Sequence, residues 1–290
     1  MKVTKAVIPA AGLGTRVLPA SKAVPKEMLP IVDKPAIQYI VEEAVSAGIT
    51  DILVITSRGK SLIEDHFDHA PELEQKLLAN EKQALYDAVV SLAHICNIQY
   101  VRQKETKGLG HAVWCAKSFV GNEPFAVLYG DDVIISPSRP AIGEMISAYE
   151  EYSKCVVGIK RVALEEITKY CTLGVKKISE HIYDVYDMIE KPTPDEVISD
   201  FAILGRCLLT SDIFDLLEKT PPSRNGEIQL TDAMRILARR GNMMGVEYSG
   251  TRYDMGNKLG ILQATVEVGL SHPEIGSDFR AYLKEIAKSL

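Results

Sequence analysis

A glycine-rich segment near the N-terminus carries the side chains best suited to bind phosphate. Gly12 and Gly14 remove side chains where a phosphate or a base must approach the backbone closely. The cations Arg16, Lys22 and Lys26 follow in the same segment and provide positive charge for several phosphate oxygens at once. These residue types in this order indicate a site for a nucleoside triphosphate.

Two commoner glycine motifs fit this segment less well. A P-loop requires Gly-x-x-x-x-Gly-Lys-Ser/Thr, a pattern that the sequence lacks. A dinucleotide fingerprint requires a third glycine and a helix that starts directly from the loop, whereas Val17 takes the third position and Pro19 follows it. Asp33 does imitate the ribose-binding acid of that fingerprint, so a nicotinamide-dependent oxidoreductase stays a less favoured alternative.

Acidic residues further along the chain could hold a metal ion. Asp131 and Asp132 follow an apolar run, so their carboxylates are expected at the carboxyl edge of a parallel sheet, where open α/β sheets bind ligands. Mg²⁺ commonly takes one or two carboxylates together with substrate phosphates, and Asp254 is the candidate second acid. The structural alternative is that Asp131 caps a turn and Asp132 is solvated.

Other polar residues could recognise a base and a sugar. The Gln103 amide both donates and accepts hydrogen bonds, as the edge of a pyrimidine requires, and Gly108 follows it before a predicted helix. Glu190 could accept hydrogen bonds from sugar hydroxyls, and Lys191 could bind a sugar phosphate. Each of these segments also has a plain structural interpretation, as a helix start and as a surface turn.

The elements that must position these residues alternate between apolar strands and helices. An apolar strand, a long loop, a helix from Lys34 and a strand at residues 52–56 form a βαβ crossover, which implies a parallel sheet with helices on both faces. The pattern predicts further strands at residues 98–101, 125–129, 155–159 and 202–204, and helices near residues 72–95, 110–119, 141–152, 211–218 and 229–240. We therefore expect a doubly wound α/β fold.

The chain is expected to have one catalytic body and a helical end. Residues 1–257 form the predicted catalytic domain, in which residues 171–200 read as an antiparallel insertion that makes one wall of the site. Residues 258–290 read as two helices that could contact a second subunit.

Composition excludes several classes of protein. The 290 residues are 46% hydrophobic and 25% charged, as in an ordinary globular protein, and no signal peptide or membrane-spanning segment is predicted. A net charge of -6 gives no basic footprint for nucleic acid or for an anionic membrane. Five dispersed cysteines without a Cys-x-x-Cys pair favour a reducing cytoplasm and argue against a structural metal.

Taken in order, the motifs resemble those of the bacterial UTP:glucose-1-phosphate uridylyltransferases (UDP-glucose pyrophosphorylases), members of the sugar nucleotidyltransferase family, over nearly the whole chain. The motifs that carry the resemblance are Pro9-Ala10-Ala11-Gly12-Leu13-Gly14-Thr15-Arg16, Pro25-Lys26-Glu27-Met28-Leu29-Pro30, Arg102-Gln103-Lys104-Glu105, Gly108-Leu109-Gly110-His111-Ala112, Gly130-Asp131-Asp132, Glu190-Lys191-Pro192, Glu227-Ile228-Gln229-Leu230-Thr231-Asp232 and Arg252-Tyr253-Asp254.

The resemblance implies a fold, an activity and an assembly. The fold is a Rossmann-like three-layer α/β/α arrangement with a mixed, mostly parallel central sheet. The activity is transfer of the uridylyl group of UTP to glucose 1-phosphate by Mg²⁺-dependent in-line attack, which yields UDP-glucose and pyrophosphate. The assembly is a homodimer or homotetramer.

It also implies roles for individual residues. Those expected to bind the nucleotide are Ala10, Ala11, Gly12, Gly14, Gln103 and Gly108. Those expected to bind the sugar phosphate are Gly174, Glu190 and Lys191. The catalytic cations are Arg16, Lys26 and Lys191, and the metal-binding acids are Asp131 and Asp254.

The sequence departs from the family's pattern mainly on the sugar side. Residues 171–173 precede Gly174 where a tyrosine is usual, and Cys207 replaces a common tyrosine. The alternatives that stay open are a thymidylyltransferase, a uridylyltransferase for another sugar 1-phosphate, and a regulatory paralogue that binds nucleotide sugar without turnover.

Overall fold

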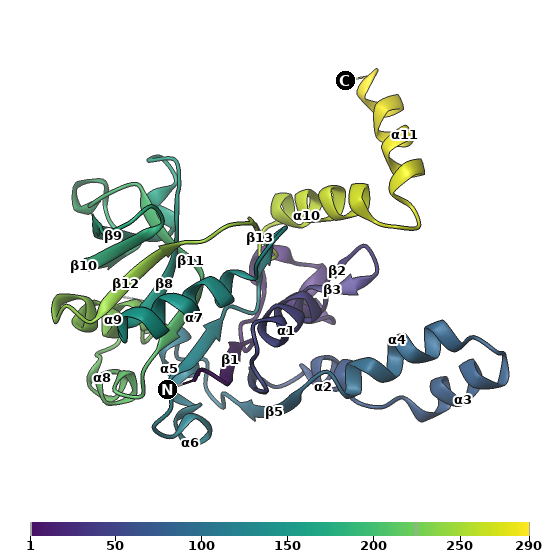
Figure 1. Cartoon of the computed structure of the whole chain (residues 1–290), viewed down its shortest axis with the longest axis horizontal. Coiled ribbons are helices and arrows are strands. Elements are labelled where there is room, and N and C mark those ends of the chain that lie inside the picture. The colour runs from purple at the N-terminus through teal and green to yellow at the C-terminus, as the bar shows by residue number, and fades with distance from the viewer. Residues whose placement is uncertain (1, 224, 290) are drawn as a thin grey trace.

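One large mixed sheet runs through the protein, which is described here by a computed structural model of residues 2–223 and 225–289 (Figure 1). The described residues give this sheet nine strands in the order β5-β4-β1-β6-β11-β8-β12-β10-β9. Their bounds are β1 (Lys5–Pro9), β4 (Asp51–Thr56), β5 (Asn97–Arg102), β6 (Phe125–Leu128), β8 (Cys155–Arg161), β9 (Cys171–Lys177), β10 (Ile182–Glu190), β11 (Phe201–Leu209) and β12 (Met243–Glu247). All of them except β10 and β11 run in one direction, so the predicted mixed sheet is confirmed.

Both faces of the sheet are buried by helices. In β1, Ala6 and Ile8 face one apolar core and Val7 faces the other, as the period of two in a strand requires. Helices α1 (Ala36–Ser46) and α7 (Ala141–Tyr152) pack on the first face, and α5 (Leu109–Trp114), α8 (Ile213–Lys219) and α9 (Leu230–Arg239) pack on the second. Burial on both faces explains why the central strands read as continuous apolar runs.

Several predicted elements have different bounds in the structure. The helix expected at residues 72–95 is two helices, α3 (Pro71–Ala79) and α4 (Gln83–Ala93), because the chain turns at Glu81, which has a φ of 57°. In Figure 1 this pair extends away from the sheet as an arm. The helix expected at residues 110–119 is likewise divided into α5 and α6 (Lys117–Val120), and the strand expected at 202–204 is the longer β11.

The sequence pattern did not predict several of the short elements. They are the helix α2 (Ser61–Phe67) and the strands β2 (Pro30–Ile31), β3 (Lys34–Pro35), β7 (Asp132–Ile135), β12 and β13 (Thr251–Asp254). Strands β7 and β13 pair with each other in a separate antiparallel ribbon, in which Asp254 lies opposite Asp132. This ribbon matters for the site because it joins two acidic segments that are far apart in sequence.

The sugar-side insertion contains antiparallel strands and the C-terminal end contains two helices, as expected. Strands β9 and β10 are antiparallel, as expected for residues 171–200, and they extend one edge of the sheet. Helices α10 (Lys258–Ser271) and α11 (Gly276–Ala287) follow β13, and α11 leads away from the body in Figure 1. Among the helices of residues 2–223 and 225–289, none is long and apolar enough to cross a membrane.

Candidate active site

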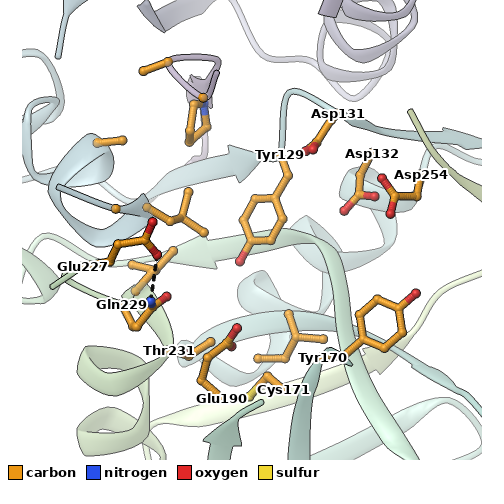
Figure 2. Close-up of a pocket in the computed structure, with 18 of the residues that line it drawn as sticks. Tyr129, Asp131, Asp132, Tyr170, Cys171, Glu190, Glu227, Gln229, Thr231 and Asp254 are labelled. Atoms are coloured by element: carbon orange, nitrogen blue, oxygen red, sulfur yellow. Dashed lines mark hydrogen bonds between the residues drawn. The ribbon is translucent and has the colours of Figure 1, made fainter. Parts of the chain in front are cut away.

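A cleft of about 870 Å³ opens at the carboxyl edge of the sheet. Pro9, Gln103 and Tyr129 line it and stand at the carboxyl ends of the parallel strands β1, β5 and β6. This is the edge at which open α/β sheets bind their ligands, and the volume is that of an ordinary small-molecule site. The glycine-rich loop contributes to the wall. The segments around residues 131, 170, 190, 229 and 254 also contribute (Figure 2).

The glycine-rich loop lies along one side of the cleft. Gly14 has a φ of 67°, a backbone conformation that favours glycine, and its carbonyl accepts a hydrogen bond of 2.7 Å from the Ser21 hydroxyl. A side chain on Gly12 would meet the Lys26 ammonium at 3.7 Å, so the loop backbone and this cation lie against each other. Arg16 and Lys26 line the cleft as predicted, whereas the exposed Lys22 does not.

Gln103 and Gly108 form the base side. The backbone N–H of Gln103 donates to Thr56 O at 2.8 Å. The buried side-chain Nε2 of Gln103 donates to Gly108 O at 3.1 Å and contacts His111 Nδ1 at 2.9 Å, so the amide is held from two sides. Gly108 has a φ of 92°, and a Cβ there would lie 2.7 Å from Glu227 Cβ. A glycine is therefore required where the loop passes the segment before α9, for a reason that the local sequence does not reveal.

A cluster of three carboxylates, Asp131, Asp132 and Asp254, lies beside the cations; we call it the acid cluster. Lys26 pairs with Asp131, and Arg16 spans Asp131 Oδ2 at 3.8 Å and Asp254 Oδ2 at 3.3 Å. The main chain fixes this meeting because the Met255 N–H donates to Asp131 O at 2.8 Å. The structure thus brings together the residues that the sequence assigned to phosphate and metal binding.

The cations and carboxylates of this group each favour the ionised form of the other. Burial would lower the pKa of Lys26, but Asp131 and Glu27 raise it above its ordinary value. Burial likewise opposes ionisation of Asp131, but Lys26 and Arg16 hold the pKa of its carboxyl below the usual range. Both groups therefore stay charged at neutral pH.

Asp132 has a different role from the solvated one that the structural alternative gave it. It is buried, and Arg252 Nη2 lies 2.5 Å from its Oδ1. Its carbonyl accepts a hydrogen bond of 2.8 Å from the guanidinium of Arg206, a fully buried side chain that pairs with Glu43. This buried ion pair anchors the turn that carries Asp131 and Asp132.

The donor set fits a hard divalent cation. A Cβ built on Gly256 would lie 3.0 Å from both Asp131 Oδ2 and Asp254 Oδ1 and 2.5 Å from Arg16 Nη2, so two carboxylates and the Arg16 guanidinium converge on one small space that only a glycine leaves open. Among the described residues, no group of three or more His, Cys, Asp or Glu side chains could hold a metal by itself. Two carboxylates are nevertheless what Mg²⁺ requires when substrate phosphates complete its shell.

Glu190 and Lys191 lie at the other end of the cleft. Burial raises the pKa of the Glu190 carboxyl, and Lys191 opposes that rise. The Lys191 N–H donates to Tyr170 O at 2.9 Å, and its φ is 44°. A non-glycine residue in this left-handed region costs roughly 1 kcal/mol or more, which is typical of functional turns.

Some predicted residues lie off the wall, and some wall residues were not predicted. Ala10 is buried behind the loop, where its N–H donates to Ile55 O at 2.8 Å. Gly174 pairs with Asp187 between β9 and β10, and the Tyr186 ring covers its α-carbon, so the geometry does not support direct contact with a sugar. The wall residues to which the sequence assigned no role include Tyr129, Tyr170, Cys171, Gln229, Thr231 and Arg252.

Comparisons with known proteins find similarity over nearly the whole chain. Residues 5–269 match the nucleotidyl transferase family model. The UTP--glucose-1-phosphate uridylyltransferase YngB of Bacillus subtilis strain 168 is 50% identical over 287 residues, 99% of this chain and 96% of that protein. A UTP--glucose-1-phosphate uridylyltransferase of Staphylococcus epidermidis is 47% identical over 285 residues, 98% of this chain and 99% of the relative.

Solved structures give the same picture. A UDP-glucose pyrophosphorylase complexed with UDP-glucose is 43% identical with a TM-score of 0.83, over 91% of this chain and 97% of that one. A UTP-bound UGPase from Acinetobacter baumannii is 38% identical with a TM-score of 0.88, over 98% of this chain and 99% of that one.

Proposed function

The chain belongs to the nucleotidyl transferase family, and on that premise we propose that it transfers the uridylyl group of UTP to glucose 1-phosphate, yielding UDP-glucose and pyrophosphate. The proposal rests on one observation, which is that the cations Arg16 and Lys26 form ion pairs with the carboxylates of Asp131 and Asp254 at the edge of the cleft. Fixed cations beside carboxylates suit a reaction between two polyanions, which repel each other in water.

The chemistry needs no nucleophile from the protein. A phosphate oxygen of glucose 1-phosphate forms a bond to the α-phosphorus of UTP, and the bond from that phosphorus to the bridging oxygen breaks, so its electron pair leaves with pyrophosphate. Arg16 and Lys26 bind the triphosphate and stabilise the charge that develops on the leaving group. Lys191 holds the phosphate of the sugar phosphate near its line of attack.

Mg²⁺ is the cofactor that this donor set supports. Asp131 and Asp254 would hold it, and when bound it neutralises phosphate charge that the two cations do not reach. Lys26 and Arg16 contact the same carboxylates, so they also keep these acids ionised and oriented.

Recognition of the substrates is divided between the two ends of the cleft. The backbone of residues 11–14 and the Gln103 amide, held by Gly108, bind the uracil and ribose. Glu190 accepts hydrogen bonds from the sugar. Gly174 contributes indirectly, because its missing side chain lets Tyr186 pack over β9.

The direct test is to incubate the purified protein with UTP, glucose 1-phosphate and Mg²⁺ and to quantify UDP-glucose and pyrophosphate by ion-exchange chromatography. We expect equal amounts of both products, and none when a chelator is present. Competition by thymidine triphosphate and by other hexose 1-phosphates measures the preference. Failure to form product from UTP and glucose 1-phosphate, in protein that binds UTP, would favour another sugar phosphate or a regulatory paralogue.

The fold type, the assembly and the cellular compartment are also part of the proposal. Helices on both sheet faces support the three-layer, Rossmann-like description. The exposed Leu259 and Leu262 of α10 and Tyr282 of α11 support these helices as contacts in a homodimer or homotetramer, which light scattering after gel filtration would measure. Five unpaired cysteines support a reducing, cytoplasmic compartment.

A further inference from the structure

Tyr129 places a phenol in the middle of the cleft. It directly follows β6, and its N–H donates to Gly205 O at 2.9 Å, which fixes its main chain against β11. In Figure 2 the ring lies between the acid cluster and the side chains of Glu190 and Thr231, and the hydroxyl is directed away from the acid cluster. The phenol therefore faces the end of the cleft that holds the sugar in the proposed function.

The Tyr129 hydroxyl has a weak partner in the described part of the chain. Its hydrogen-bonding contact there is Cys207 Sγ at 3.6 Å, and sulfur is a poor donor and a poor acceptor. Burial raises the pKa of Cys207 to about 12, so this partner is a neutral thiol. A tyrosine phenol keeps its proton at neutral pH, so the Tyr129 hydroxyl can donate a hydrogen bond to a better acceptor.

A second hydroxyl lies on the same wall. Thr231, in the first turn of α9, is 7% exposed, and its hydroxyl is within hydrogen-bonding reach of the Glu190 carboxyl. Thr231 comes from α9, Glu190 from the end of β10 and Tyr129 from the end of β6, so three separate elements place polar groups on this wall of the cleft.

The surroundings suit a hexose. The hydroxyls of Tyr129 and Thr231 and the Glu190 carboxylate share this wall with the apolar side chains of Cys171 and Ile203. A sugar ring presents hydroxyl groups at its edge and C–H groups on its faces, which match such a wall. Tyr129 also lies two residues before Asp131, a span of at most ~7 Å, so a sugar attached to the reacting phosphate comes within reach of the phenol.

On the basis of the proposed function, we propose that Tyr129 is a specificity-determining residue whose hydroxyl binds one ring hydroxyl of the hexose of glucose 1-phosphate. Thr231 provides a second hydroxyl contact to the same ring. The phenol selects among hexose 1-phosphates and takes no part in binding UTP.

The test is the variant Tyr129→Phe, which removes one oxygen and keeps the ring. We expect its KM for glucose 1-phosphate to rise about tenfold while its KM for UTP is unchanged. Monodeoxy analogues of glucose 1-phosphate, each lacking one ring hydroxyl, should then identify the contact. With the analogue that lacks the bound hydroxyl, the wild type and Tyr129→Phe should have equal KM values.

Two control variants separate binding from structure. Cys207→Ala removes the sulfur contact of the phenol, so it should reproduce the defect only if the hydroxyl has a merely structural role. Tyr86→Phe makes the same chemical change on α4, outside the cleft wall, and should leave both KM values unchanged. A rise in KM for UTP equal to that for glucose 1-phosphate, or an equal penalty with every deoxy analogue, would overturn the assignment.

A binding measurement makes this result independent of turnover. UDP-glucose should raise the Tm of the wild type more than UDP does, and Tyr129→Phe should lose most of that excess. Wild-type protein that forms no UDP-glucose refutes the proposed function. Equal shifts with UDP-glucose in wild type and Tyr129→Phe refute the role of Tyr129, whether or not the wild type is active.

Discussion

Lys60 donates a hydrogen bond of 2.8 Å to Glu27 Oε2 in the protein interior, where both side chains are almost completely buried. Glu27 directly follows Lys26 in the chain, so this ion pair lies beneath the residue that contacts the acid cluster. Burial raises the pKa of Glu27, and Lys60 opposes that effect. The pair therefore supports the loop that positions Lys26.

Removing the cation of this pair should destabilise the protein strongly. Lys60→Met keeps the length of the side chain but leaves a buried carboxylate uncompensated, so the free energy of unfolding should fall by about 3 kcal/mol. Denaturant unfolding measures the change. The double variant with Glu27→Leu should recover most of the loss, because a buried apolar pair needs no compensation. A single variant as stable as the wild type would contradict the interpretation.

Lys26→Ala should reduce kcat roughly 10²- to 10³-fold, because it removes one charge aimed at the triphosphate and the departing pyrophosphate. Lys22→Ala is the matched control, since Lys22 lies in the same loop but is exposed and outside the cleft wall. Initial rates at saturating UTP and glucose 1-phosphate compare the two variants. Equal effects would mean that the loop contributes only its overall charge.

Gly256→Ala should impair catalysis with little effect on folding. The added Cβ would lie 2.5 Å from Arg16 Nη2 and 3.0 Å from two carboxylate oxygens of the acid cluster, so the charged groups must move apart. A displacement of this size should lower kcat/KM about 100-fold and increase the Mg²⁺ concentration needed for half-maximal activity. Steady-state rates over a Mg²⁺ titration, with Tm as the check on folding, give the answer. An unchanged titration curve would place the metal elsewhere.

The sequence was sufficient to predict several residues that the structure places together at the cleft, because they lie in short, distinctive motifs. Arg16, Lys26, Asp131 and Asp254 were all predicted, and the structure brings them together. The β7–β13 ribbon brings Asp254 close to the other residues. Strands this short carry too few residues for a recognisable alternation of apolar and polar side chains. Long-range pairing, unlike a motif, leaves no local signal.

On the sugar side of the cleft, the local sequence likewise does not show which residues face a ligand. Tyr129 reads as the last residue of a buried strand, and periodicity alone cannot distinguish a core aromatic from one that faces a ligand. Its position in the cleft depends on Gly205 and Cys207 of β11, which are distant in sequence. For Gly174 the resemblance implied a substrate contact, and in the structure the neighbouring strand places Tyr186 over this glycine.

Asp187 links β10 to α9 by accepting hydrogen bonds from two arginines. Arg235 approaches its two carboxylate oxygens at 2.7 and 3.1 Å, and Arg239 approaches them at 3.0 and 3.1 Å. These hydrogen bonds hold the pKa of Asp187 far below its ordinary value. This contact fixes the strand that ends at Glu190 against the helix that carries Thr231.

The contribution of Asp187 to stability should therefore depend on pH in a definite direction. Because its pKa is lower in the folded than in the unfolded protein, the contribution is complete above the unfolded value of about 4 and is lost as the pH falls below it. Asp187→Asn should lower the free energy of unfolding by about 2 kcal/mol at neutral pH, and the difference from wild type should shrink as the pH approaches ~3.

Asp184→Asn is the control for this prediction. It lies on the same strand and has one ion pair, with Lys154 at 3.3 Å, so its loss should cost less than about 1 kcal/mol at neutral pH. Urea unfolding of the three proteins between about pH 7 and about pH 3 measures both effects. If the Asp187→Asn difference were the same across that range, the two arginines would be stabilising the aspartate by packing and not through its charge.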